Sequence, residues 1–211
     1  MRLIFVSVLA IALAGCAGKV EYLRPTSSVA LGANVKSIAK PRDAVWTAAV
    51  PELGKRFFVI NNLDKASGLI NISYAGNPEK FIDCGRITSY VKNAQGERNY
   101  NFAGSKSQQS YEIMNPGVGL FFIDRRMSLE GRVNVIFEEV GPNETRVTAN
   151  TRYVVQRQRV VRNAANNIPQ TLNDSVTFNT ASSAAFAGPA DSAAECAATG
   201  ALEREILEAI R

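Results

Sequence analysis

The sequence predicts one α+β domain in which an antiparallel sheet packs against an N-terminal and a C-terminal helix. Three patterns predict it: an apolar stripe at helical spacing over residues 41–56, an alternating hairpin over residues 128–157, and a second helical stripe near the C-terminus. Because the apolar face of such a sheet must be covered, both helices are expected on that face. With 46% hydrophobic and 20% charged residues, the composition is that of a globular protein.

The N-terminus has the pattern of a bacterial export signal. After a positive start, residues 3–14 form an apolar run too short to span a bilayer, and Leu13-Ala14-Gly15-Cys16 follows. This ending resembles the lipobox of bacterial lipoproteins. The resemblance implies that residues 1–15 are removed as a signal peptide, that the Cys16 thiol carries a diacylglyceryl group, and that its new amine is acylated, for example by palmitate. An ordinary secretory signal with a chance cysteine is the alternative.

The residue after the cysteine bears on which membrane holds the anchor. Ala17 is not acidic, which in Gram-negative lipoproteins permits export to the outer membrane, where the chain would face the periplasm. In a Gram-positive cell the same chain would stay on the plasma membrane; we expect the Gram-negative case. Residues 16–30 are polar and aperiodic, so they are expected to form a lipidated tether, with a short strand as the alternative. A single domain over residues 31–211 would follow.

Three cysteines are present, and lipidation would use Cys16. In an oxidising compartment the remaining pair, Cys84 and Cys196, predicts a disulfide. It would tie the middle of the chain to the C-terminal helix. Two buried thiols or a redox site are the alternatives, although the sequence has no CxxC motif to support the second.

The clearest helix candidate covers residues 41–56. Pro41 suits the first turn, where its missing N–H costs nothing. Trp46 and Leu53 belong to an apolar stripe at a spacing of three to four residues. Pro51 lies inside this pattern, so we expect a kink there or a helix broken in two.

Strands are expected to follow this helix. The best hairpin covers residues 128–157, where apolar and polar residues alternate on both sides of a turn at 141–144. A C-terminal helix is expected to begin at Asp191 and Ser192. Its inner stripe would be Cys196, Thr199, Leu202, Ile206 and Ile210. Shorter strands are expected at residues 57–62, 68–74, 81–84, 86–92, 107–114, 119–124 and 175–180.

One passage carries a family resemblance. A tryptophan-containing helix leads into a strand, and a D-x-x-S-G-L-I turn opens the next strand, over Ala44-Val45-Trp46, Leu53, residues 57–60 and residues 63–70. The passage resembles the helix-grip modules of the outer-membrane lipoprotein BamC and related proteins. The resemblance implies a helix-grip-like α+β fold and a non-catalytic accessory role in the machinery that inserts β-barrels. It carries over no binding residue, because the matched positions are typical of core and turn.

Four arginines lie close together in a stretch without acidic residues: Arg152, Arg157, Arg159 and Arg162. Arginine binds phosphate and carboxylate groups through two parallel hydrogen bonds. The stretch is therefore a candidate surface for an anionic lipid headgroup, a glycan or an acidic protein patch. The alternative is that these arginines only face solvent, or that their charge keeps an edge strand from pairing with another chain. Nucleic acid is not an expected partner of an exported lipoprotein.

The sequence offers little support for catalysis. It has no histidine, which excludes histidine triads and histidine metal ligands, and it has no P-loop or nucleophile elbow. We expect no enzyme activity, no catalytic residue, no metal and no cofactor. The leading hypothesis is an outer-membrane-anchored accessory or scaffold subunit of an envelope protein complex, for example in β-barrel insertion. The alternative is a carrier that binds a lipid or small ligand in the groove between sheet and helix.

Overall fold

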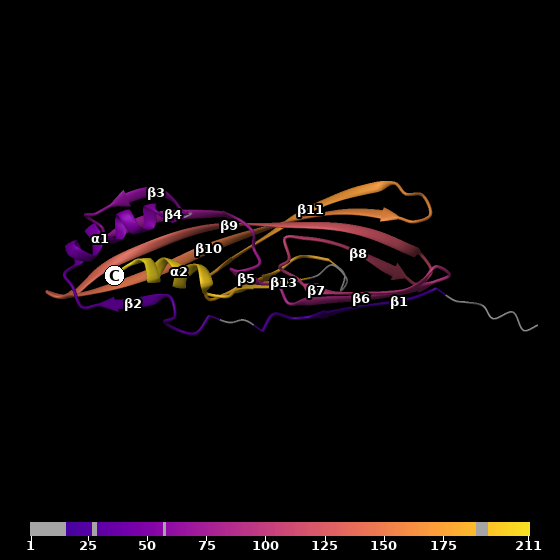
Figure 1. Cartoon of the computed structure of the whole chain (residues 1–211), viewed down its shortest axis with the longest axis horizontal. Helices are drawn as coiled ribbons and strands as arrows, with labels where there is room; N and C mark the ends of the chain where they lie inside the picture. The colour runs from indigo at the N-terminus through magenta and orange to yellow at the C-terminus, as the bar shows by residue number, and fades with distance from the viewer. Residues whose placement is uncertain (1–15, 27–28, 57, 189–193) are drawn as a thin grey trace, which may run out of the picture.

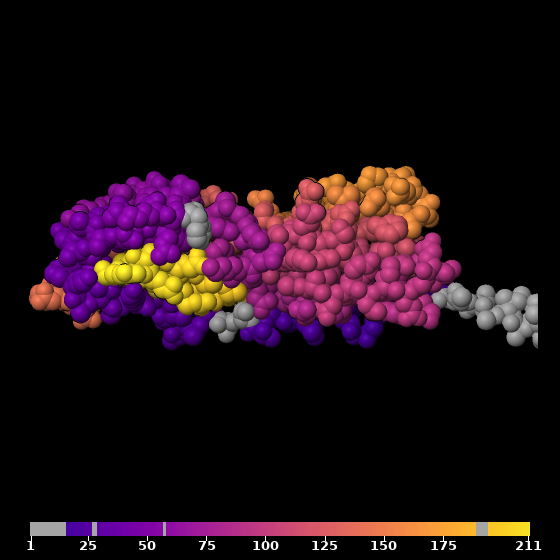
Figure 2. All heavy atoms as spheres, in the orientation of Figure 1, coloured from indigo at the N-terminus to yellow at the C-terminus, as the bar shows by residue number. Residues whose placement is uncertain are grey.

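A computed structural model describes residues 16–26, 29–56, 58–188 and 194–211; the predicted signal peptide lies outside these ranges. The chain forms an elongated body built around one long hairpin, as the ribbon in Figure 1 and the space-filling view in Figure 2 show. The hairpin consists of β9 (Gly119–Gly141) and β10 (Glu144–Asn163). At about 3.3 Å per residue, the 23 residues of β9 extend over about 75 Å.

The alternation of side chains explains why these residues form a hairpin. Val133 and Val135 on β9 and Val147 on β10 are buried, while the residues between them face outward. The register is unbroken from the Thr145–Glu139 pair to the Asn163–Phe121 pair. The predicted hairpin is therefore confirmed, and its strands continue beyond the predicted bounds at the open end.

The hairpin changes partners partway along. Near its turn, β9 pairs with β4 (Leu69–Gly76), β4 pairs with β3 (Val59–Asp64), and β10 pairs with β2 (Val35–Ile38). Toward the open end, β9 pairs with β8 (Gln108–Asn115) and β10 pairs with β11 (Pro169–Asn179). The same two strands thus form the centre of the sheet in both halves of the body.

Among the described strands, two smaller antiparallel sheets complete the fold. The larger consists of β1 (Ala17–Leu23), β6 (Arg86–Asn93) and β7 (Gly96–Ala103). It lies against β8, where the Ser89 hydroxyl donates to the Glu112 carbonyl oxygen at 2.5 Å. The smaller sheet consists of β12 (Ser183–Ala185), β13 (Glu195–Ala198) and β5 (Ile82–Asp83).

The helices α1 (Arg42–Gly54) and α2 (Ala201–Ala209) pack near the hairpin turn (Figure 1). The Trp46 ring meets Phe137 of β9 edge-on, with ring centroids 5.2 Å apart. The helix predicted over residues 41–56 is confirmed, and it continues through Pro51 rather than breaking in two. A smaller core lies in the other half of the body, between β8, β9 and the β1–β6–β7 sheet, and consists of Ile87, Phe102, Tyr111, Ile113 and Ile123.

The predicted α+β fold of the helix-grip type is wrong. The described residues are mostly β, with 60% in strands and 12% in helices, and the strands form several antiparallel sheets. The reason is length: the 13 residues of α1 rise about 20 Å, whereas β9 extends about 75 Å. Helices therefore cover one half of the hairpin, and another sheet must cover the rest. The passage around Trp46 and Leu69 contributes to α1, β3 and β4, but the helix-grip fold expected around it is not present.

The ends of the described chain also differ from the prediction. α2 begins at Ala201, because Gly200 adopts a left-handed φ of 71° and the residues before it extend as β13. Cys196 and Thr199 therefore precede the helix, and the predicted helix start at Asp191 lies outside the described residues.

The N-terminal segment expected to be a tether contains a strand instead. β1 pairs with β6 along its whole length. Val20 and Tyr22 explain this order, since both pack against the smaller core. The alternation of these side chains was too short to distinguish a strand from a tether in the sequence.

Candidate functional site

Cys16, the predicted lipid attachment point, is exposed and directly precedes β1. It borders a hollow of about 580 Å³, together with the turns that join β6 to β7 and β8 to β9. Lipidation of Cys16 remains a prediction. Because β1 is hydrogen-bonded to β6 from Ala17 onward, an anchor at this position would be attached directly to the folded body.

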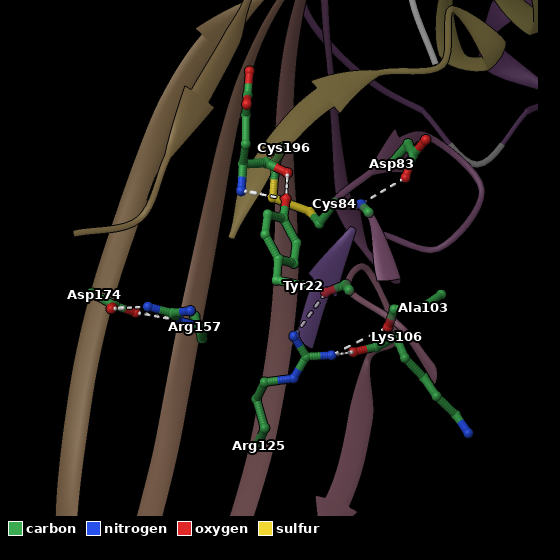
Figure 3. The surroundings of a disulfide bond; sticks show 12 residues. Tyr22, Asp83, Cys84, Ala103, Lys106, Arg125, Arg157, Asp174 and Cys196 are labelled. Carbon is green, nitrogen blue, oxygen red and sulfur yellow. Dashed lines mark hydrogen bonds and ion pairs between the residues drawn. A yellow bond between two sulfur atoms is a disulfide. The ribbon is translucent and has the colours of Figure 1, made fainter. Parts of the chain in front are cut away.

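The predicted disulfide is confirmed: Cys84 and Cys196 are bonded, and both are fully buried. Beside it, the Tyr22 hydroxyl accepts a hydrogen bond from the Glu195 N–H at 2.7 Å and donates one to the Glu195 carbonyl oxygen at 3.0 Å (Figure 3). The bridge and this tyrosine therefore connect β1, the residue after β5 and β13, three segments far apart in the sequence.

The four arginines predicted as one surface lie on two sides of β10. Side chains alternate along a strand, so Arg157 and Arg159 point inward while Arg152 and Arg162 point outward. Arg157 is 2% exposed and holds the Asp174 carboxylate through Nε at 2.9 Å and Nη2 at 2.5 Å (Figure 3). Arg159 reaches the same carboxylate at 3.3 Å. These two arginines therefore fasten β10 to β11.

The charges around Asp174 change its acidity. Burial opposes ionisation of this carboxyl, but the hydrogen bond and charge of Arg157 and the charge of Arg159 outweigh burial. The pKa of Asp174 consequently lies below its ordinary value. The carboxylate is ionised throughout the neutral range and balances part of the buried positive charge.

Sequence reasoning missed another buried arginine. Arg125 of β9 is 1% exposed and donates to the carbonyl oxygens of Gly104 at 2.8 Å, Ala103 at 3.4 Å and Lys106 at 3.5 Å (Figure 3). Burial lowers its pKa to about 10. The signal was available in the alternation of β9, which places its odd-numbered residues inside. The Arg125 guanidinium holds the connection between β7 and β8, and its burial keeps it from contacting a partner.

A buried carboxylate attaches α2 to the sheet. Glu203 is fully buried and accepts hydrogen bonds from the Tyr153 hydroxyl, 2.8 Å from each carboxylate oxygen, and from the Thr180 hydroxyl at 2.8 Å. Burial and the charge of Glu203 raise the pKa of Tyr153, so the phenol stays protonated and donates. These hydrogen bonds hold α2 against the sheet and indicate a structural role for Glu203.

The outer face of the hairpin carries the strongest candidate for a binding site. Arg132 and Arg152 stand directly opposite each other, and Asn134 and Asn150 form a neighbouring pair. The Asn34 side chain donates to Asn150 Oδ1 at 2.9 Å. They line a hollow of about 660 Å³ where β10 changes partner from β2 to β11. We call this hollow the arginine–asparagine groove and define it by Asn34, Arg132, Asn134, Asn150, Arg152 and Asn179.

The charges of the groove favour an anionic ligand. Like charges directly opposite each other on paired strands repel. The positive charge of Arg132 is balanced by Glu130, whose Oε1 lies 2.8 Å from both Nε and Nη2 of Arg132. Arg152, in contrast, is exposed to solvent. A carboxylate or phosphate between the two arginines would relieve the repulsion through paired hydrogen bonds. The asparagine amides offer further donors and acceptors.

The same outer face stays polar toward the open end of the hairpin. A second hollow, of about 720 Å³, lies there and involves β8 through β11. Amides and hydroxyls dominate its outward-facing lining, which includes Arg126, Ser128, Gln156, Gln158, Asn173 and Ser175. The face thus offers many hydrogen-bonding side chains, with Val154 as an apolar residue among them.

Comparison with known proteins gives no match: no family model, curated protein or solved structure is similar to this chain. Neither helix of the described chain has the length and apolar character needed to cross a membrane. Within the described ranges, no three histidine, cysteine, aspartate or glutamate side chains gather as a metal site requires.

The disulfide should contribute strongly to stability. Replacing both cysteines (Cys84→Ala with Cys196→Ala) opens a cross-link with a sequence separation of 112, so the free energy of unfolding should fall by about 4–5 kcal/mol in the chain-entropy treatment. Urea unfolding monitored by circular dichroism measures it. Cys16→Ser, which leaves the bridge intact, is the control. An unchanged unfolding midpoint in the double variant would contradict the expected stabilisation.

The ion pair at Asp174 should make stability depend on acid pH. Because the folded-state pKa is depressed, its stabilisation is present above the unfolded value of about 3.9 and is lost as the pH falls through the lower folded value. Asp174→Asn should cost about 1.5–3 kcal/mol at pH 7 and less below pH ~3. Unfolding curves at both pH values test this, with Asn173→Asp as a charge control on the outer face. An equal cost at both pH values counts against the assignment.

Proposed function

We propose that this chain is a non-catalytic, lipid-anchored scaffold of the bacterial envelope, attached to the outer membrane through Cys16 and facing the periplasm. The observation that carries the proposal is the direct continuation of Cys16 into β1, which pairs with β6 along all of its seven residues. An anchor at Cys16 would therefore hold an elongated body, with β9 extending about 75 Å, without an intervening flexible arm. Such a body can hold a partner at a set distance from a membrane.

Cross-links between distant segments support the stiffness that a scaffold needs. The disulfide joins the residue after β5 to β13, Arg157 joins β10 to Asp174 of β11, and Glu203 joins α2 to Tyr153 of β10. Each contact is wholly or largely buried, where it is shielded from solvent screening. These links favour one fixed shape over hinged parts.

The arginine–asparagine groove is the proposed contact surface. Its exposed Arg152 and the opposing Arg132 would pair with carboxylates of an acidic segment in another subunit of an envelope complex. An anionic lipid headgroup or glycan presents the same kind of charge and is the competing occupant. The lining combines these polar side chains with Val29 and Leu31, so a partner segment could add apolar contacts to its ion pairs.

The carrier alternative draws less support from the structure. It would use a groove between the sheet and the helices, and that space is filled by side chains. Trp46, Leu53, Leu202 and Ile206 are each 7% exposed or less. The hollows described above lie elsewhere, on the outer face and beside Cys16. A filled core and an exposed polar face favour contact with a protein.

Loss of the anchor cysteine should release the protein. Cys16→Ser removes the thiol that would carry the lipid, so the protein should move from the membrane fraction to the soluble periplasmic fraction. Cell fractionation with radiolabelled palmitate measures both properties. Ala17→Ser, which keeps the cysteine, should remain labelled and membrane-bound. If Cys16→Ser stays in the membrane fraction, the anchor is not at this residue.

Partner contact through the groove can be tested by crosslinking in cells. A photo-reactive residue in place of Asn179, which is exposed in the groove and pairs with Arg152, should capture an envelope protein. The same residue in place of Arg146, which is exposed on the outer face of β10 outside the groove, should not. Adding Arg152→Glu should abolish the capture, because it reverses the charge beside the probe. Capture of the same proteins from both positions, or of none above background, would defeat the proposal.

A further inference from the structure

We infer that the end of the body next to Cys16 seats on the lipid bilayer, with Val118 and Ile168 entering its interface. The inference rests on the lipid anchor of the proposed function and adds how the body stands on the membrane. Figure 1 places this end, where β1 begins and β8 turns into β9, opposite the end that holds α1 and the β9–β10 turn.

The turns at the Cys16 end carry no charge. Residues 93–96, 115–119 and 163–170, which join three pairs of strands, contain no aspartate, glutamate, lysine or arginine. The first two turns border the hollow beside Cys16, as does Ala164 of the third. Ala164 also donates its N–H to the Leu120 carbonyl oxygen at 2.8 Å. The turns therefore meet in one uncharged surface around the anchor position.

The opposite end has charged residues in and beside its turns. The hairpin turn there is flanked by Glu138, Glu139 and Glu144, and the turn between β3 and β4 contains Lys65. At the Cys16 end, Lys92 and Glu97 flank the β6–β7 turn, but these two side chains pair with each other at 2.6 Å. Charged side chains are costly to bring toward hydrocarbon. The turns around Cys16 are therefore better suited to lipid, and the predicted lipid attachment point lies among them.

Apolar side chains project from the uncharged turns. Val118 is 64% exposed and Ile168 is 67% exposed. Exposed apolar residues also occur toward the opposite end, but there they stand beside charged residues: Leu63 precedes Asp64 and Lys65, and Val140 follows Glu139. Turn backbones need hydrogen-bonding partners, so the turns themselves belong at headgroup level rather than in the hydrocarbon. Their asparagine and glutamine side chains suit that polar layer.

The hollow beside Cys16 supplies an apolar wall for the start of the acyl chains. Met114, Val118 and Leu120 line it next to the cysteine. Because β1 runs from this point along the body, seating these turns would make the long axis rise from the bilayer. The turn at Pro142 and Asn143 would then be the part of the hairpin farthest from the lipid.

The test uses the lipidated mature protein, which begins at Cys16, in vesicles of phosphatidylethanolamine and phosphatidylglycerol. An environment-sensitive dye is placed on a new cysteine in Val118→Cys or Ile168→Cys, with Asn143→Cys as the matched control at the opposite end. All three positions are exposed, so the variants should fold. Iodide, which stays in water, should quench the dye at positions 118 and 168 several-fold less than at position 143.

The outcomes separate this inference from the proposed function. If the protein floats with the vesicles and the three dyes are quenched equally, Val118 and Ile168 do not enter the bilayer interface, but the proposed lipid anchor at Cys16 is supported. If the unlabelled wild-type protein does not float with vesicles at all, the lipid anchor fails and the seating falls with it. Protection at positions 118 and 168 alone supports both.

Discussion

The backbone pairing of β9 with β10 is the interaction on which the rest of the structure depends. Its register runs without a break from Glu139 to Phe121, so the two strands act as one long support. The apolar side of that support has to be covered along its full length. Near the turn α1 and α2 cover it, and toward the open end β1, β6 and β7 do so. An elongated body follows from this division.

The long β9–β10 hairpin also buries charged side chains on its inner face. Arg125 and Arg157 occupy inward-facing positions on paired strands, and they bind different groups: the first donates to backbone carbonyls, the second to the Asp174 carboxylate. Their contacts connect neighbouring strands and the loop after β7. Arginines that point outward on the same strands, such as Arg152, remain available to a partner. Under the proposed function, partner contact and stability would be divided between the two faces of one hairpin.

The sequence predicted local features well and their extent poorly. Alternation around Val135 and Val147 revealed the hairpin, the stripe around Trp46 revealed α1, and the count of cysteines revealed the bridge. Alternation does not show which strand will be a neighbour. It therefore could not predict the change of partner along β10, or that β1 helps to cover the core at the open end of the hairpin. The arginines were grouped by their closeness in sequence, although the parity of Arg152 and Arg157 already placed them on opposite faces.

An anchor at Cys16 on a stiff body would hold that body upright on the membrane. Energy transfer from a donor dye on Asn143→Cys to acceptor dyes on lipid headgroups tests this orientation, in vesicles that carry the lipidated protein. From the length of the 23-residue β9, we expect the donor to lie about 75 Å from the bilayer surface and therefore to show almost no transfer. Efficient transfer would mean that the body lies flat or swings freely, so the proposed upright attachment would be wrong.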